Sequence, residues 1–70
     1  MSWNYRVVKK DDQLAVHGVY YDDAGKIIGL DENPNYPFGE DLEELQYRLA
    51  LMNESLKQAI IDFKTLKEIK

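Results

Sequence analysis

The stretch Gly39-Glu40-Asp41-Leu42-Glu43-Glu44-Leu45 separates two parts of this chain that have different hydrophobic periods. Before it, apolar residues tend to alternate with other residues, as they do in β-strands; after it, they recur every three or four residues, as they do in an α-helix. Asp41 is suited to be the N-cap of that helix, because its carboxylate can accept the Glu44 amide and the Glu44 side chain can reach back. The stretch therefore predicts where a sheet ends and a helix begins.

Three strands are expected before this stretch, over Trp3–Lys10, Leu14–Tyr21 and Lys26–Asp31. The last two are joined by the hairpin loop Asp22-Asp23-Ala24-Gly25, in which Gly25 supplies a positive φ. The connections between the strands are too short for crossovers, so we predict a three-stranded antiparallel meander. Pro34 and Pro37 in the following loop would break any further ladder.

The apolar stripe after the boundary has a period of about 3.5 residues. It comprises Leu42, Leu45, Leu49, Met52, Leu56, Ala59, Phe63 and Leu66. Residues 41–69 contain no Pro or Gly, so the pattern favours one long C-terminal helix, which would span roughly 40 Å and extend beyond its own sheet. In the alternative, the helix stops near Gln58, residues 59–63 run back in extended form, and a short helix capped by Asp62 starts at about Lys64. The predicted fold is a single small α+β domain over residues 1–70, β-β-β-α, with a break near 59–63 left open.

Length and composition limit what such a domain can be. The chain has 70 residues, no Cys and a formal net charge of −4. A domain of this size buries only about 60% of its unfolded surface, and without disulfides or thiolate metal sites oligomerisation is the remaining source of extra stability. The acidic balance argues against nucleic acid and anionic lipid as partners, and no apolar run is long enough to span a membrane. We expect a cytoplasmic protein without a cofactor.

Three patterns could carry chemistry, and each has a simpler structural interpretation. Asp22-Asp23-Ala24-Gly25 has some features of a calcium loop, but two of its ligand positions would be held by Tyr20 and Ala24, which have no carboxylate. His17 could be a general base beside a tyrosine, yet no Ser or Cys nucleophile accompanies it in a recognisable arrangement. Acidic residues adjacent in sequence point in different directions. We expect no catalytic residue and no metal site; an enzyme that uses His17 and a tyrosine is the alternative.

Aromatic side chains are the best candidates for an interaction surface. One helix can cover only one face of the predicted sheet, yet both faces carry apolar residues, and an open apolar face marks an interface. Self-association is the simplest way to cover it, and a heteromeric protein partner or a flat apolar ligand is the competing occupant. The low positive charge makes base stacking unlikely. The candidate interaction surface comprises Trp3, Tyr5, His17, Tyr20, Tyr21 and Phe63.

Five short segments form a signature: Trp3-Asn4-Tyr5-Arg6, His17-Gly18-Val19-Tyr20-Tyr21-Asp22, Gly25-Lys26, Glu32-Asn33-Pro34 and Gly39-Glu40-Asp41-Leu42-Glu43-Glu44-Leu45. In these segments, from residue 3 to about residue 56, the chain resembles a group of small bacterial proteins with no assigned function. The resemblance implies no activity. In that group a proline often falls near the position of Ala59, which implies a shorter helix followed by an extended tail.

A looser similarity is to HicB-type antitoxins, whose β-β-β-α domain has a helix that opens after a run like Gly39–Glu44. This similarity implies a toxin-neutralising domain with a degenerate double-stranded-RNA-binding-like fold, and the acidity of the chain fits inhibition of an RNA-binding toxin better than RNA binding. The expected function is a non-enzymatic bacterial interaction domain that forms a homodimer or binds a protein partner. The alternative is a HicB-like antitoxin that neutralises a small RNase toxin.

Overall fold

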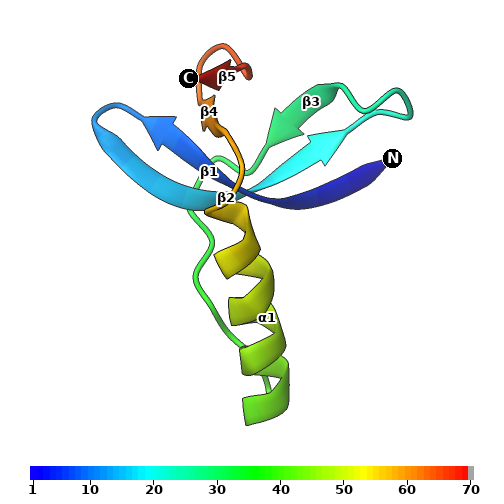
Figure 1. Cartoon of the computed structure of the whole chain (residues 1–70), viewed down its shortest axis with the longest axis vertical. Helices are drawn as coiled ribbons and strands as arrows, with labels where there is room; N and C mark the ends of the chain where they lie inside the picture. Colours follow the sequence, from blue (N-terminus) through cyan, green and yellow to red (C-terminus); the bar gives the residue numbers. More distant parts are fainter. Residues whose placement is uncertain (70) are drawn as a thin grey trace.

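One helix and five strands make up the protein, seen in a computed structural model that describes residues 1–69. The elements are β1 (Ser2–Lys10), β2 (Gln13–Tyr21), β3 (Ile27–Leu30), α1 (Leu42–Ser55), β4 (Ile60–Asp62) and β5 (Glu68–Ile69) (Figure 1). The strands form a single sheet in the order β3-β2-β1-β4-β5. The sheet curls into a half-barrel, and α1 projects from its convex side (Figure 1). The domain is therefore α+β, with all five strands in one strongly bent layer.

The sheet is mixed rather than antiparallel throughout. β1 pairs antiparallel with β2, and β2 with β3, but β4 pairs parallel to β1 on its other side, with Val8 opposite Ile61. The prediction of a three-stranded antiparallel meander followed by one helix is therefore wrong. The chain after α1 returns to the sheet because Ile60 and Ile61 are β-branched residues that fit a half-buried ladder, and β5 then pairs antiparallel with β4.

The helix is also much shorter than the long helix that the stripe favoured, since it ends at Ser55 and not near residue 69. The Ser55 hydroxyl donates back to the Met52 carbonyl, and the Leu56 amide donates to the Asn53 carbonyl at 3.1 Å. Bonds of this i to i−3 kind tighten the last turn and end a helix without any Pro or Gly. The apolar pattern in the sequence continues past the end of the helix because the strand that follows, β4, is also apolar.

The alternative with a broken helix is correct in one part and wrong in another. Residues 60–62 are extended, as it expected, but no short helix starts at Lys64. Instead, Asp62 caps a single turn: its side chain accepts the Thr65 amide at 2.9 Å and its carbonyl accepts the Leu66 amide at 2.9 Å. Leu66 has a left-handed φ of 60°, which turns the chain back into β5 and stops helical growth.

The hydrophobic core lies on the concave side of the sheet. Its fully buried members are Val8, Val19 and Ile61, and the half-buried residues packed against them are Tyr21, Ile27, Leu30 and Phe63. The curl of the sheet and the return of residues 60–63 thus cover the face that was expected to remain open. The apolar centre of the concave face is therefore covered, and the exposed apolar side chains are to be sought on the helix side.

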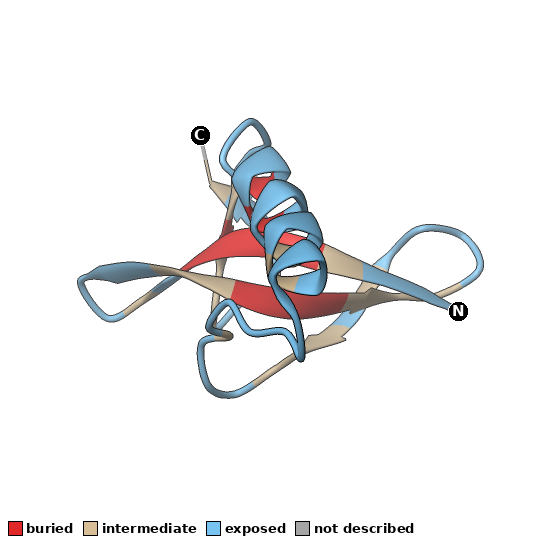
Figure 2. Ribbon diagram, turned by 90° about the horizontal axis from the view of Figure 1, so that it is seen from below, coloured by how far each residue is buried: buried red, intermediate tan, exposed pale blue. Residues whose placement is uncertain are grey.

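On the convex side, α1 packs on the centre of the sheet through few residues. Tyr5 and Val7 of β1 are buried there together with Met52 of α1. In Figure 2 the central parts of β1 and β2 are buried behind the helix, whereas α1 itself is almost entirely exposed. The predicted N-cap is confirmed, because the Asp41 carboxylate accepts the Glu44 amide at 2.8 Å. The helix is therefore well started but poorly covered.

Candidate functional site

The largest set of exposed apolar side chains on one element is on α1. Leu42, Leu49 and Leu56 are 69%, 46% and 66% exposed. They are seven residues apart, and a heptad spacing drifts by only about 20° per repeat, so they share one side of the helix and of the residue that follows it. We call these three leucines the helix stripe.

The helix stripe is exposed because the sheet contacts a different side of α1. Arg48, Met52 and Ser55 have the spacing i, i+4, i+7 and form the side that faces the sheet. The Arg48 guanidinium donates to the Tyr5 hydroxyl at 2.6 Å, and Met52 and Ser55 are buried. The domain's own core therefore does not use the helix stripe.

The loop before α1 adds two more exposed aromatic rings. Tyr36 and Phe38 lie with their ring centroids 5.6 Å apart, and the Arg48 guanidinium lies 4.1 Å from the Phe38 ring. Arg48 also donates to the Phe38 carbonyl at 2.9 Å, so the loop is fixed against the helix. The exposed apolar surface on this side of the molecule therefore continues from α1 onto the preceding loop.

The residues predicted to form one interaction surface lie on two sides of the sheet. Trp3 and Tyr5 are on the convex side with their rings in an edge-to-face contact at 5.1 Å, and Trp3 is opposite Tyr20 in the β1–β2 register. Trp3 remains exposed, whereas Tyr5 is buried under α1. The concave side holds the other three, which are His17, Tyr21 and Phe63.

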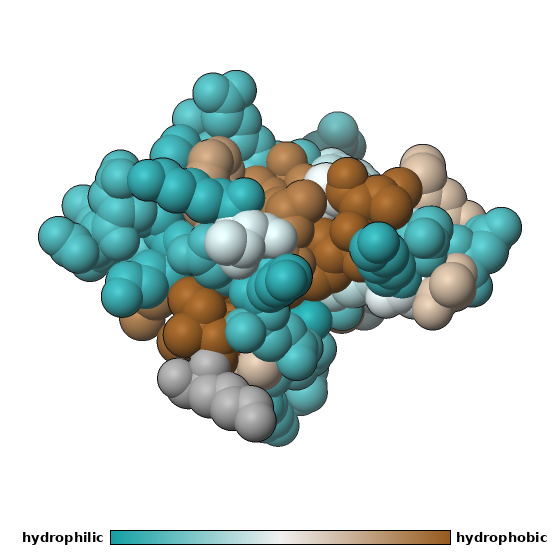
Figure 3. Space-filling view, turned by 90° about the horizontal axis from the view of Figure 1, so that it is seen from above, coloured by the Kyte–Doolittle hydropathy of each residue, from teal (hydrophilic) through white to brown (hydrophobic). Residues whose placement is uncertain are grey.

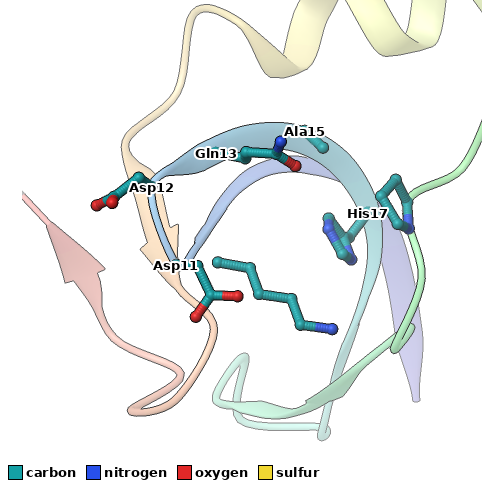
Figure 4. A pocket seen from close by; sticks show the side chains of 7 residues that line it. Asp11, Asp12, Gln13, Ala15 and His17 are labelled. Carbon is teal, nitrogen blue, oxygen red and sulfur yellow. The ribbon is translucent and has the colours of Figure 1, made fainter.

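His17 lies inside the curl of the sheet and is only 1% exposed. Its Nδ1 is 2.8 Å from the Asp31 carbonyl oxygen, which can only accept, so Nδ1 carries a proton and donates. His17 lines a cavity of about 510 Å³ at the β1–β2 turn, together with Lys10 and Asp11, while Asp12 points away from it (Figure 4). Within residues 1–69, no Ser or Tyr hydroxyl is hydrogen-bonded to His17. The arrangement holds the loop at Asp31 and does not place a nucleophile beside a base.

A second polar network uses the side chain of Asp31. The Tyr20 hydroxyl donates to Asp31 Oδ1 at 2.6 Å, and the Asn35 amide donates to Oδ2 at 2.9 Å. The bond from Tyr20 is the main reason, and that from Asn35 the next, why the pKa of Asp31 lies below its usual value, and the same bond raises the pKa of Tyr20. Because the Asn35 backbone amide also donates to the Val16 carbonyl at 2.8 Å, the network fixes the loop after β3 on β2.

Sequence reasoning missed two sets of residues that matter in the folded molecule. The three leucines of the helix stripe were identified as part of a longer apolar stripe, but only the structure shows that they are exposed while Met52 of the same longer stripe is buried. Arg6 was not among the candidate residues, and nothing in the sequence indicated that it would be buried. Its guanidinium donates to the Tyr21 hydroxyl, the Ala59 carbonyl and the Glu68 carboxylate.

No match was found when the chain was compared with models of protein families, with curated proteins and with solved structures. Residues 1–69 contain no group of three His, Asp or Glu side chains placed to hold a metal ion. The helix they contain is too short and too polar to cross a membrane. The features that bear on function are therefore the exposed surfaces described above, above all the helix stripe.

Proposed function

We propose that the protein is a small cytoplasmic, non-enzymatic interaction domain that self-associates through the helix stripe. The observation that carries the proposal is the exposure of Leu42, Leu49 and Leu56 on one side of a helix that its own sheet barely covers. Burying a leucine side chain contributes about 1.5–3 kcal/mol, so three leucines left in water are an unused source of stability. A chain of 70 residues has few other sources.

The size of the exposed surface supports a partner. The protein exposes 5304 Å², whereas a folded monomer of 8.2 kDa is expected to expose about 4,500 Å². The excess of about 800 Å² is what one partner buries in an interface of standard size. The radius of gyration, 12.3 Å, also exceeds the value of about 11 Å expected for a compact domain of this length. The projecting helix accounts for both differences.

The arrangement of the helix stripe favours a second copy of this chain as the occupant. Leu49 lies midway between Leu42 and Leu56. In two antiparallel helices related by a twofold axis at Leu49, Leu42 of each copy would therefore contact Leu56 of the other copy. The first turn of α1 carries Glu43 and Glu44, and its last turn carries no basic residue. Antiparallel packing keeps these acidic turns apart and brings opposite ends of the two helix dipoles together. A surface with this symmetry is complementary to itself.

Light scattering after size exclusion at about 100 µM tests the proposal, because dimers of typical weak affinity are populated at that concentration. We expect the wild type to have the mass of a dimer and Leu49→Glu to have the mass of a monomer, since two buried carboxylates would face each other across the axis. Tyr47→Glu is the matched control. Tyr47 is 68% exposed but lies on a different side of α1, so this variant should remain dimeric.

Two results would contradict the proposal. A wild-type protein that is strictly monomeric at this concentration has no self-association to explain. A Leu49→Glu variant that stays dimeric while Tyr47→Glu dissociates would place the interface on the opposite side of the helix. Circular dichroism of each variant shows that α1 is still formed, so that a change of mass can be assigned to the interface.

A further inference from the structure

We propose that the groove between β3 and β5 binds an extended, acidic segment of a partner polypeptide, which adds as a strand along β3 and places a carboxylate on Arg6. This groove is on the concave side of the sheet, away from the helix stripe, and the inference does not depend on self-association (Figure 1).

β3 and β5 are the two edges of the sheet, and its curl turns them toward one another. Both contribute walls to a single groove of about 620 Å³, with Ile27 on the β3 side and Glu68 on the β5 side. A half-barrel with facing edges leaves room for one more extended segment, and adding a strand is a common way to bind a peptide. Seen from above, apolar surface gathers in the middle of this side and hydrophilic groups surround it (Figure 3).

The groove is positively charged although the protein is acidic. Its charged lining residues are Arg6, Lys26, Lys67 and Glu68, so cations outnumber carboxylates by three to one, whereas the whole chain has a net charge of −4. Lysines beside an edge strand hinder pairing with a neutral strand. They attract a strand that carries carboxylates, so the same residues give both protection and selectivity.

Arg6 forms the buried end of the groove. Only 5% of Arg6 is exposed, and its Nε has no hydrogen-bond partner among the described residues. One Nη donates to the Tyr21 hydroxyl at 3.2 Å, and the other donates to the Ala59 carbonyl at 2.7 Å. A buried guanidinium is held in a fixed orientation by these bonds, which suits it to bind a carboxylate.

Glu68 already shows how Arg6 receives a carboxylate. One oxygen of Glu68 accepts from Arg6 Nη2 at 3.0 Å, while the Glu68 side chain itself is 59% exposed. The exposed Glu68 carboxylate can return to water, and an incoming carboxylate that takes its place leaves the buried guanidinium paired throughout. Glu68 is therefore a replaceable occupant of the position that the partner's carboxylate would take.

The β3 edge supplies the remaining contacts. β3 pairs with β2 on one side only in the part of the chain that the structure describes, so its other side is available for a ladder. Ile28 in this strand is half-exposed and offers an apolar neighbour to an added strand. Residues of a strand point alternately to its two sides, so the preferred partner alternates acidic and β-branched residues.

The test uses the blocked peptide acetyl-Val-Glu-Val-Asp-Val-Glu-amide and two-dimensional NMR of the ¹⁵N-labelled full chain. We expect saturable shifts at the amides of residues 26–30 and 67–69, and weaker binding as salt is raised, because the attraction is screened. Lys26→Glu combined with Lys67→Glu should weaken binding at least about tenfold. Glu68→Gln should tighten it about two- to fivefold, because the competing carboxylate is gone.

The controls separate a peptide site from general attraction. Lys57→Glu reverses one charge on the helix side, half the change of the double variant, and it should leave the affinity unchanged. The same peptide with Lys in place of its acidic residues should not bind. The proposal is overturned if acetate alone produces the same shifts and the peptide adds none along β3, or if Glu68→Gln weakens binding. Shifts at residues 26–30 and 67–69 that appear with protein concentration and without peptide would instead assign the groove to a second copy of the chain and would also overturn it, whereas such shifts confined to α1 would report the helix stripe.

Discussion

Gly18 lies where β2 has no room for a side chain. A Cβ at this position would be 2.5 Å from Asp31 Oδ2, the oxygen that accepts from Asn35. The carboxylate would have to move, and it cannot do so without breaking its 2.6 Å bond from Tyr20. The glycine in the middle of an otherwise apolar strand is thus explained by a close approach and not by a turn.

We therefore predict that Gly18→Ala destabilises the domain by about 1–3 kcal/mol, through overpacking and through the loss of hydrogen bonds to a half-buried carboxylate. Gly29→Ala is the matched control, because a Cβ on that strand glycine has no neighbouring atom within 4 Å. Urea unfolding of both variants gives the comparison. Equal stabilities for the two variants would show that Asp31 can move aside freely, and that the network does not hold the loop.

At the scale of elements, the start of α1 is determined by residues close to it in the sequence, whereas its end also depends on a distant strand. Asp41 caps the helix with its own side chain, and a capping residue lies within three positions of the amide it serves, so sequence alone identified it. The end at Ser55 depends on a hydroxyl that bonds within the last turn and on a strand that is recruited by β1. No Pro or Gly marks that position. The hairpin loop that ends in Gly25, with its φ of 83°, was equally local and was predicted.

The same contrast explains why the predicted meander followed by one helix was wrong. Ile60 and Ile61 continue an apolar pattern that suits a helix or a strand, and only the partner strand decides between them. Alternation assigns residues to the two faces of a strand but cannot show that the sheet curls, so it did not indicate how deeply each residue of the candidate interaction surface would be buried. The curl of the sheet buries His17, and the exposed apolar side chains lie on α1 instead.

Loss of the cap should weaken α1 and with it the surface that α1 carries. Asp41→Ala is expected to cost about 1 kcal/mol, because the Glu44 amide is left without its acceptor. Glu40→Ala removes a charge one position earlier that makes no capping bond, and it should cost much less. Thermal unfolding followed at 222 nm measures both. A cost for Glu40→Ala as large as that for Asp41→Ala would mean that charge at the helix start matters more than the capping bond.

At the scale of the whole molecule, the two proposed surfaces lie on opposite sides of one curled sheet. The helix α1, which carries the helix stripe, projects from the convex side, and the strands β3 and β5, which contribute walls to the groove, lie on the concave side (Figure 1). The hydrophobic core is small, since Val8, Val19 and Ile61 are the only apolar side chains among residues 1–69 that are completely buried. A domain of this kind can bind a second copy on one side and a peptide on the other without the two partners meeting.

Because the core is small, self-association should contribute measurably to the free energy of unfolding. If two copies bury the helix stripe, unfolding separates them, and the midpoint of thermal unfolding rises with protein concentration by a few degrees for each tenfold increase. Leu49→Glu should unfold at a lower temperature that no longer changes with concentration. Tyr47→Glu should keep the slope of the wild type, because it leaves the stripe intact. A wild-type midpoint that is constant between about 5 and 500 µM would exclude stabilisation by self-association, since linkage requires the slope wherever only the folded chain associates.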